Sequence, residues 1–442
     1  MLMRSPFASA LHPIPSTMSA SDAAQHPSRR GFLSTVGSAI GGAAAVGALP
    51  APLSAMSALA LNSAAPARGL AAAGDFMFEP GLHYLQTGSM GPTPRPVMQR
   101  TIAYWQELER NPTKYGYGDH EKGLEVVRSK AAALIGCTTA EIVLTTSTSD
   151  GMNRVAQGLS LNAGDHVLTT DQEHPGGRAC WDYLVRTRGV VLDVVPIVPG
   201  EHDASAIVAR MARAITPQTR VISFSHILSS TGLRMPVIEF CALARAHDCV
   251  SIVDGAQAVG GVAVNVKTLG CDVYATSGHK WLLAPKGTGL LYLRDGLGTR
   301  VDPIQLQSGR EAYTASTGVC NLPGVLGLGA AIEYHMTRTS ATIEAYNLSL
   351  RARLDVALQT VPNIEIVSAR EPGLTSPLLS YRLPDAIKAG DLRERLDVRH
   401  RVYVKIVPGN WFNGQRISTH LFNTEGDVDA LVRALRVELA RG

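Results

Sequence analysis

The 442-residue chain is long enough to form one large core or two domains that share a cleft. Its 41 basic and 37 acidic residues give a formal charge of +4, which is not the basic excess of a nucleic-acid-binding protein, and no nucleic-acid partner is predicted. The six cysteines are spread along the chain without a CxxC pair. This pattern excludes a zinc cluster and a dense disulfide framework, so no metal site is predicted.

Residues 1–62 differ in composition from the rest of the chain and are predicted to be a leader. Arg29 and Arg30 stand before a Gly/Ala-rich apolar run and a tail of small residues, which resembles a twin-arginine export signal. A membrane anchor is the alternative, but the run at 31–49 is barely long enough to span a bilayer and is rich in glycine. We therefore expect recognition by the export machinery and a periplasmic location.

The chain from residue 63 to residue 325 alternates between strand-like and helical patterns. Residues 63–90 are interpreted as an N-terminal arm, and the stretch GLHYLQTGSMGPTPRPV reads as a strand and a Pro/Gly turn before a helix. Short β-branched runs then follow at 141–146, 165–170, 190–197, 220–226, 249–255 and 287–293. Helical stretches such as 236–248 separate most of them. This alternation predicts an α/β fold for residues 91–325, with a mainly parallel sheet covered on both faces.

The pattern changes beyond Pro323. A long helical stretch is followed by strand-like runs at 378–383, 402–407 and 415–422, and then by an amphipathic closing helix. One face of that helix carries Val428, Leu431, Val432, Leu435 and Leu439. Residues 326–442 are therefore predicted to form a smaller α+β domain that shares a cleft with the larger one.

Polar residues stand where the predicted strands end. Asp254 ends an apolar run and is followed by Gln257, and Lys280 comes after the next stretch, within VYATSGHKW. Ligands of open α/β sheets bind at the carboxyl ends of parallel strands, so a site is expected here. The nearby glycines do not form GxGxxG, and the lysine and glycine of PKGTG are in the wrong order for a P-loop. Dinucleotides and nucleoside triphosphates are therefore disfavoured as ligands.

A lysine held among glycines can act as a nucleophile, because burial beside a cofactor disfavours its ammonium form. Pyridoxal 5'-phosphate suits this pattern, since it needs a Schiff-base lysine, a carboxylate facing its pyridine nitrogen, and hydroxyls with a helix N-terminus around its phosphate. Lys280 and Asp254 are the candidates for the first two roles. The phosphate contacts are predicted to come from Thr148, Ser149, Ser277 and His279. Taken singly, such residues are more often caps or packing residues, and it is their combination that favours the site.

The stretches DGAQAVGG and SGHKW resemble the class-V aminotransferase family of fold-type-I pyridoxal-phosphate enzymes. The resemblance extends over residues 80–440 through SMGPTPRPV, EHPGG, SHILSSTGLRMPV and RISTHLFNTEGDVDAL, and is similar to the isopenicillin-N-epimerase-like branch. It implies a mainly parallel sheet of the seven-stranded type, a smaller C-terminal domain and a homodimer. Lys280 would hold the cofactor, with Asp254 on its ring nitrogen and Gln257 on its phenolic oxygen. His174 would stack on the ring, and Arg416 would clamp the substrate carboxylate.

One departure from the family narrows the chemistry. No cysteine occurs after Cys320, so the persulfide-forming thiol that a cysteine desulfurase needs in its small domain is missing. The leading interpretation is an exported enzyme of the transaminase or epimerase type. It would act at the amino-bearing carbon of an amino acid or small peptide through a Lys280 aldimine and a carbanion, with Asp254 and His174 also catalytic. The alternatives are a C–S β-lyase without a persulfide cysteine and a catalytically inactive exported binding protein.

Two tyrosines and a second histidine stand outside this set of site residues. Tyr115 and Tyr117, in KYGYGDH, would either line the substrate pocket or pack at a helix start. His226, in SFSHILSS, is interpreted as structural.

Overall fold

The structure is a computed structural model that describes residues 69–72 and 74–441, apart from the side chain of Thr299. The predicted leader at 1–62, with Arg29 and Arg30, lies outside the described residues. Within the described part of the chain, no helix combines the length and apolar character needed to cross a membrane. The same residues contain no cluster of His, Cys, Asp and Glu side chains suited to a metal ion.

A seven-stranded sheet lies at the centre of the fold, in the strand order β2-β8-β7-β6-β5-β3-β4. Its strands are β2 (Ile142–Thr145), β3 (His166–Thr170), β4 (Val191–Val195), β5 (Thr219–Ser225), β6 (Val250–Asp254), β7 (Val273–Ser277) and β8 (Gly289–Leu293). All neighbours pair in parallel except β8, which is antiparallel to both β2 and β7. The predicted α/β fold with a mainly parallel sheet is confirmed. β7 was not among the predicted strands, although Val273, Tyr274 and Thr276 of its sequence VYATS are residue types that favour strands.

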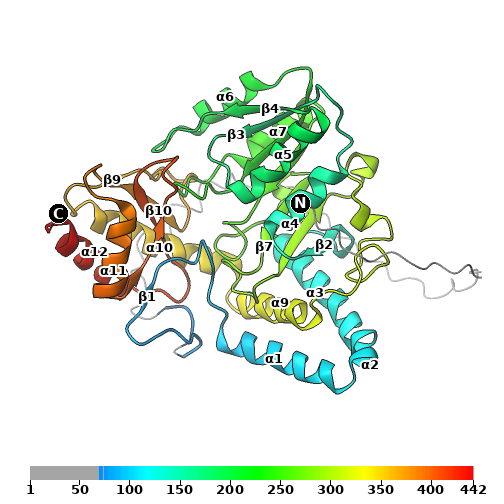
Figure 1. Cartoon of the computed structure of the whole chain (residues 1–442), viewed down its shortest axis with the longest axis horizontal. Helices are drawn as coiled ribbons and strands as arrows, with labels where there is room; N and C mark the ends of the chain where they lie inside the picture. Colours follow the sequence, from blue (N-terminus) through cyan, green and yellow to red (C-terminus); the bar gives the residue numbers. More distant parts are fainter. Residues whose placement is uncertain (1–68, 73, 442) are drawn as a thin grey trace, which may run out of the picture. The chain divides into compact units, whose positions relative to one another are not determined.

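Helices cover both faces of this sheet, which explains why its strands read as continuous apolar runs. On β8, Leu290 and Tyr292 join one hydrophobic cluster, and Leu291 and Leu293 join the other. The first cluster packs against α3 (Asp119–Ile135), α7 (Val237–Ala246) and α9 (Leu322–Met336), and the second against α4 (Thr148–Gly158) and α5 (Pro175–Arg188). Figure 1 shows α9 alongside α1 (Arg95–Arg110). The remaining helices of this part are α2 (Pro112–Gly116), α6 (Ala204–Ala214), α8 (Val266–Leu269) and the 3-10 turns Thr139–Glu141, Gly298–Arg300 and Ile304–Leu306.

A second, four-stranded sheet has the order β12-β13-β10-β9, and all its neighbouring strands are antiparallel. Its strands are β9 (Glu365–Ile366), β10 (Leu378–Arg382), β12 (Lys405–Ile406) and β13 (Gly414–Ser418). Figure 1 shows β9 and β10 with α10 (Ser340–Leu358), α11 (Ala389–His400) and α12 (Glu425–Leu439). All five apolar residues predicted for one face of the closing helix are buried in α12. The predicted strand at 402–407 is divided into β11 (Val402–Tyr403), which pairs with β1 (His83–Tyr84), and β12, which pairs with β13.

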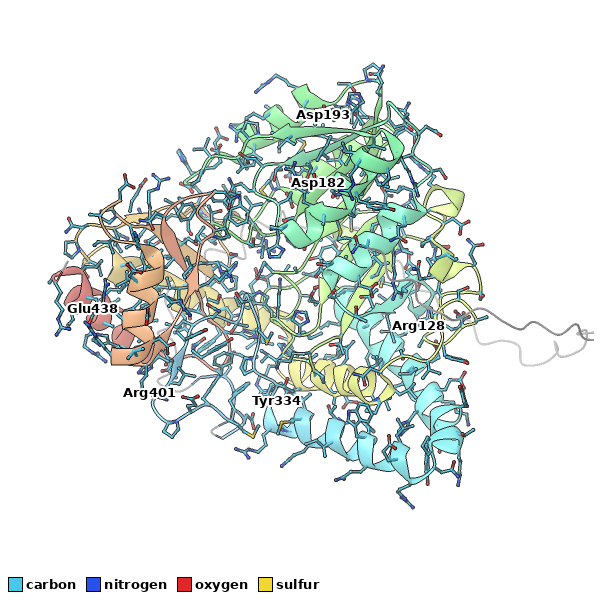
Figure 2. The ribbon with its side chains drawn as sticks, in the orientation of Figure 1. Arg128, Asp182, Asp193, Tyr334, Arg401 and Glu438 are labelled. Atoms are coloured by element: carbon cyan, nitrogen blue, oxygen red, sulfur yellow. The ribbon has the colours of Figure 1, made fainter. Side chains whose placement is uncertain are left out.

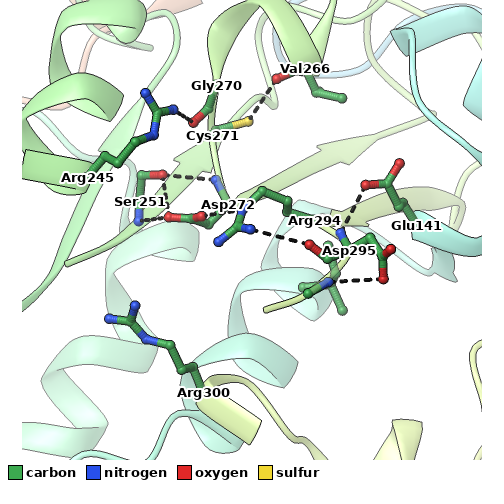
Figure 3. Close-up of polar contacts among 12 residues, drawn as sticks. Glu141, Arg245, Ser251, Val266, Gly270, Cys271, Asp272, Arg294, Asp295 and Arg300 are labelled. Atoms are coloured by element: carbon green, nitrogen blue, oxygen red, sulfur yellow. Dashed lines mark hydrogen bonds and ion pairs between the residues drawn. The ribbon is translucent and has the colours of Figure 1, made fainter. Parts of the chain in front are cut away.

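Polar contacts hold the central sheet together at the edge opposite the carboxyl ends of its parallel strands (Figure 3). The carboxylate of Asp272 accepts hydrogen bonds from the backbone and hydroxyl of Ser251 at 2.8 and 2.9 Å, and from Arg294 Nε at 2.7 Å. Nearby, Glu141 accepts a hydrogen bond from the Asp295 backbone at 2.9 Å. These contacts fix the starts of β6 and β7 and the end of β8. They lie away from the opposite edge, which is therefore available for a ligand.

Candidate active site

A cavity of about 390 Å³ lies at the carboxyl ends of β6 and β7, between the start of α4 and strands β12 and β13. Its volume is in the range of small-molecule sites. All nine predicted site residues line it: Thr148, Ser149, His174, Asp254, Gln257, Ser277, His279, Lys280 and Arg416. The topology explains this convergence, because ends of neighbouring parallel strands meet at one edge of a sheet.

Lys280 occupies a turn that follows β7. Gly278 makes the turn possible, since a Cβ at that position would lie 2.6 Å from Thr288 Oγ1. The residue is half-buried and its ammonium group lies inside, and this burial lowers its pKa to about 8, with help from the positive charges of Arg416 and Lys405 and against the attraction of Asp254. About one tenth of Lys280 is therefore neutral at pH 7 and about half at pH 8, and the neutral amine is the form that a nucleophile or a general base requires.

Asp254 ends β6 and is buried. One carboxylate oxygen accepts a hydrogen bond from the Ala256 backbone at 2.9 Å. Burial raises the pKa of Asp254, whereas the Lys280 ammonium opposes that rise. The start of α5 approaches the other oxygen so closely that a Cβ at Gly177 would lie 2.5 Å from it. The glycine in EHPGG therefore leaves room for this carboxylate.

The opposite end of the cavity is built to receive an anion. Ser277 Oγ accepts a hydrogen bond from the Thr148 backbone at 2.9 Å and lies 2.7 Å from Thr148 Oγ1. Thr148 is the first residue of the 11-residue helix α4, where the backbone dipole favours negative charge, and Ser277 ends β7 beside it. Ser149 continues this turn. Nδ1 of His279 is buried there without a hydrogen-bond partner among the described residues.

His174 and Gln257 complete the walls of the cavity. His174 caps α5, and its Nδ1 accepts a hydrogen bond from the Gly176 backbone at 3.0 Å. Its ring faces the open cavity, where partial burial and the cations Lys280, Arg416 and Lys405 lower its pKa to about 4, so the ring is neutral. The Gln257 amide is fixed at both ends: it donates to the Gly88 carbonyl and accepts from the Trp281 indole, both at 2.9 Å.

Arg416 lies in the middle of β13 and is buried. It donates hydrogen bonds to the Ser229 carbonyl at 2.7 Å and to Ser89 Oγ at 3.2 Å. Its Nε has no partner among the described residues, and burial lowers its pKa to about 10. A buried guanidinium held by neutral groups alone needs an anion for full compensation, so this side chain is suited to binding a carboxylate.

The side chains and backbone groups around this cavity fit the parts of pyridoxal phosphate. The hydroxyls and helix terminus suit its phosphate, Asp254 suits its pyridine nitrogen, and Lys280 suits its aldehyde. The cavity also contains buried polar atoms that lack partners within the described chain, namely His279 Nδ1, Ser229 Oγ and Arg416 Nε. Such atoms are rare in folded proteins unless a ligand or water satisfies them.

Several residues of this site were not predicted from the sequence. Ser89, Lys405 and Trp411 line the cavity, together with Gly88, Ser147, Pro175, Gly177, Ala256, Ile406, Val407 and Pro408. Ser229, a weaker candidate from the sequence, also lines it. Behind the wall, the Glu173 carboxylate accepts hydrogen bonds from Thr170 Oγ1 at 2.7 Å and Ser225 Oγ at 2.6 Å. Burial and the nearby charge of Asp254 raise the pKa of Glu173 to about 7. The only signal for Glu173 in the sequence is its position next to the histidine of EHPGG.

The two tyrosines and His226 lie elsewhere. Tyr115 and Tyr117 are not among the residues that line the cavity in this chain, and the Tyr117 ring instead makes an edge contact with Tyr313 at 5.6 Å. His226 is buried, with Nδ1 2.8 Å from the Tyr274 hydroxyl. This contact agrees with the structural role inferred for His226.

The fold and the lysine-containing site define an α/β enzyme of fold type I that uses pyridoxal phosphate. The sequence matches the description "Aminotransferase class-V" over residues 83–431. The chain belongs to the class-V aminotransferase family and is a pyridoxal-phosphate-dependent enzyme.

Individual relatives cover most of the chain. It is 30% identical to an isopenicillin N epimerase of Streptomyces clavuligerus, in a match that covers 82% of this chain and 96% of the relative. It is 29% identical to a cysteine desulfurase of Serratia proteamaculans, covering 80% and 93%. Among solved structures, a cysteine desulfurase from Thermococcus onnurineus has a TM-score of 0.72 at 24% identity, covering 82% of this chain and 95% of that one. This structural likeness supports the fold.

Proposed function

We propose that the protein is an exported enzyme of the transaminase or epimerase type, acting at the amino-bearing carbon of an amino acid or small peptide. The observation that carries this proposal is the placement of Lys280 and Arg416 in one cavity. An amine for the reacting carbon and a guanidinium for the adjacent carboxylate together suit an α-amino acid. The chain is also similar to isopenicillin N epimerases, whose name describes an isomerase. This similarity supports the epimerase alternative of the proposal.

The residues divide the work of the reaction among them. When bound, pyridoxal phosphate withdraws electrons from the amino-bearing carbon. Asp254 holds the proton at the ring nitrogen, and neutral His174 covers the ring face. Lys280 Nζ takes up the proton from the reacting carbon, since its pKa of about 8 leaves part of it neutral. Arg416 orients the substrate through its carboxylate. A proton supplied to the opposite face by a second donor would give epimerisation, and delivery of the proton by Lys280 to the cofactor side would give transamination.

A substrate panel tests this proposal. The purified holoenzyme is incubated with L-amino acids and short peptides, and the products are analysed for inverted stereochemistry and for keto acids. We expect one of these two products from at least one substrate, and neither product from the Lys280→Ala variant. If the only products are those of β-elimination, or if cysteine yields an enzyme persulfide, the proposal is wrong.

A C–S β-lyase is the second candidate, because cysteine desulfurases are among the relatives that cover 80% of the chain. The persulfide route itself is disfavoured by two facts. No cysteine occurs after Cys320, and no cysteine lines the Lys280 cavity in the described part of the chain. Release of pyruvate or sulfide from cysteine or cystine without a protein persulfide would favour this candidate.

Export and dimerisation are also part of the proposal. Arg29 and Arg30, with the apolar run that follows them, support recognition by a twin-arginine pathway, which carries folded proteins and so suits a cofactor loaded before transport. Cell fractionation tests this: the wild-type protein is expected in the periplasm, and the double variant Arg29→Lys, Arg30→Lys in the cytoplasm. Mature variant protein in the periplasm would contradict it.

The homodimer is supported by the large apolar side chains that this chain leaves exposed.

A further inference from the structure

We propose that Lys405 and Arg416 form a double cation that selects substrates with a second acidic group besides the α-carboxylate. This inference rests on the proposed function, because it names the class of amino acid or peptide that the Lys280 cavity accepts. Arg416 would bind the carboxylate next to the reacting carbon. Lys405 would bind an acidic group further along the substrate, as in an acidic amino acid or a peptide with an acidic side chain.

The register of the second sheet places these two cations together. β12 and β13 are antiparallel, and Lys405 is the residue directly opposite Arg416. Side chains of directly opposite residues project from the same face of a sheet, with Cβ atoms about 5 Å apart. Both residues line the cavity that contains Lys280. Two like charges in this position destabilise a strand pair, unless an anion lies between or beside them.

The protein supplies no carboxylate to balance them. Within the described part of the chain, neither Lys405 nor Arg416 forms an ion pair, and the ammonium of Lys405 makes no hydrogen bond. Burial lowers the pKa of Lys405. The nearby positive charges of Arg416 and Arg393 lower it further. Asp254 is the one acidic residue among those that line the cavity, and it lies beside Lys280.

The cofactor does not account for the excess charge. Its ring nitrogen suits Asp254, and its phosphate suits the hydroxyls and helix terminus at the start of α4. A substrate with a single carboxylate occupies Arg416 alone. One positive charge on the β12 wall then remains without an anion, and a second acidic group on the substrate would balance it.

The wall that carries Lys405 is held in place by the surrounding structure. The Val407 backbone donates to the Gly414 carbonyl at 3.0 Å, which continues the pairing of β12 with β13. Further along, the Trp411 indole donates to the Asp171 carbonyl at 3.2 Å and connects this segment to the end of β3. Lys405 is thus presented from a fixed backbone, which favours a selective contact.

Paired probes test the inference by charge alone. L-glutamate and L-glutamine have nearly the same shape and differ in the charge of the distal group. Their dissociation constants are measured from the change in visible absorbance of the bound cofactor in the holoenzyme. We expect glutamate to bind about tenfold or more tightly than glutamine, an effect typical of a charge-assisted contact. Glutarate should likewise bind more tightly than butyrate.

Variants of Lys405 then identify the source of this preference. In Lys405→Met the glutamine-to-glutamate ratio of dissociation constants should fall toward one, and in Lys405→Arg it should be largely retained. Lys122→Met, which removes a charge from an exposed position, should leave the ratio unchanged. If Lys405 only assists Arg416 at the α-carboxylate, both constants rise together and the ratio stays the same, which overturns the inference. A wild-type ratio near one, or no binding of either probe, also overturns it.

Failure of the underlying function is seen in a different measurement. If borohydride reduction leaves no pyridoxyl group on Lys280, the proposed function fails whatever the probes show. If the group is present and the charge preference is absent, only the second cation site is wrong.

Discussion

Lys280 and Asp254 illustrate how single residues set the chemistry of this cavity. Burial raises the pKa of Asp254 and lowers the pKa of Lys280, so it favours the neutral form of each. The attraction between the two opposite charges favours the charged forms instead. The bound cofactor would separate their roles, with the carboxylate at the ring nitrogen and the amine at the aldehyde. Two neighbours of Asp254 provide tests of this arrangement: Gly177, which approaches its carboxylate, and Glu173, whose pKa the nearby Asp254 charge helps to raise.

Gly177→Ala is expected to disturb Asp254 directly. The added Cβ would lie 2.5 Å from a carboxylate oxygen, so either the start of α5 or the Asp254 side chain must shift. Overpacking of this kind costs about 1–3 kcal/mol, and cofactor affinity should fall with it. Chemical denaturation and cofactor titration measure both effects. Gly390→Ala is the matched control, because its Cβ meets no atom nearer than 4.0 Å. Equal effects of the two variants would contradict this account.

Glu173 gives the protein a pH dependence of known sign. Its pKa is raised from an ordinary 4.5 to about 7 in the folded state, so the native protein binds a proton more tightly than the unfolded chain. Stability therefore decreases as the pH rises from about 4.5 to about 7, by about 3 kcal/mol. Glu173→Gln removes this loss. Denaturation of the cofactor-free protein should show the variant gaining stability relative to wild type between pH 5 and pH 8. A constant difference would contradict the assignment.

At the scale of elements, the site depends on two sheets whose strands are brought together from distant parts of the chain. The central sheet contributes strand ends, and these were predictable because parallel strands place their carboxyl ends at one edge. β12 contributes Lys405 from a two-residue strand. The sequence predicts one strand at 402–407, whereas β11 and β12 pair with different partners, and this long-range choice leaves no local pattern. Lys405 and Trp411 were missed for that reason.

Helix α10 contains a buried ion pair between two of its own residues, which makes a prediction about stability. Asp355 accepts a hydrogen bond from buried Arg351 at 3.1 Å and another from Arg370 at 3.0 Å. Asp355→Ala leaves the Arg351 guanidinium buried without its carboxylate, which costs about 3–5 kcal/mol. Glu365→Ala, which breaks an exposed pair with Arg382, should cost about 1 kcal/mol or less. Thermal or urea unfolding distinguishes the two, and similar losses would contradict the prediction.

A second cluster of charged residues joins α12 to α11 near the C-terminus. The Glu438 carboxylate on α12 receives contacts from Arg399 at 3.0 Å and His400 at 2.9 Å on α11, and its side chain is fully buried. Figure 2 shows Glu438 where α12 lies against α11. The amphipathic pattern predicted the apolar face of α12, but it could not predict this contact, because the partners lie on a different helix.

For the whole molecule, the sequence is sufficient for the fold, the family and all nine residues placed around the cavity, since these depend on strand order and on motifs. It was insufficient where partners are distant in the chain, as for Ser89, Lys405 and Glu173. The specific reaction is a further step, because one arrangement of lysine, aspartate and arginine serves several outcomes.

The proposed homodimer is a prediction at this scale. Ile102 and Trp105 lie on the same side of α1 and are 46% and 45% exposed, which is unusual for side chains of this size. Sedimentation equilibrium should give twice the mass of one chain for wild type, and a smaller mass for Trp105→Arg. Val398→Arg changes an apolar residue on α11 that is even more exposed, at 75%, and this variant should remain dimeric. A monomeric wild type, or a Trp105→Arg variant that stays dimeric, would contradict the proposal.

The central claim is that Lys280 carries the cofactor. Its most direct test is reduction of the purified holoenzyme with borohydride, followed by proteolysis and mass spectrometry. The account predicts a pyridoxyl group on the peptide that contains Lys280, and on no other lysine, together with loss of the visible absorbance band in Lys280→Ala. A pyridoxyl group on a different lysine, or an unchanged band in that variant, would contradict it.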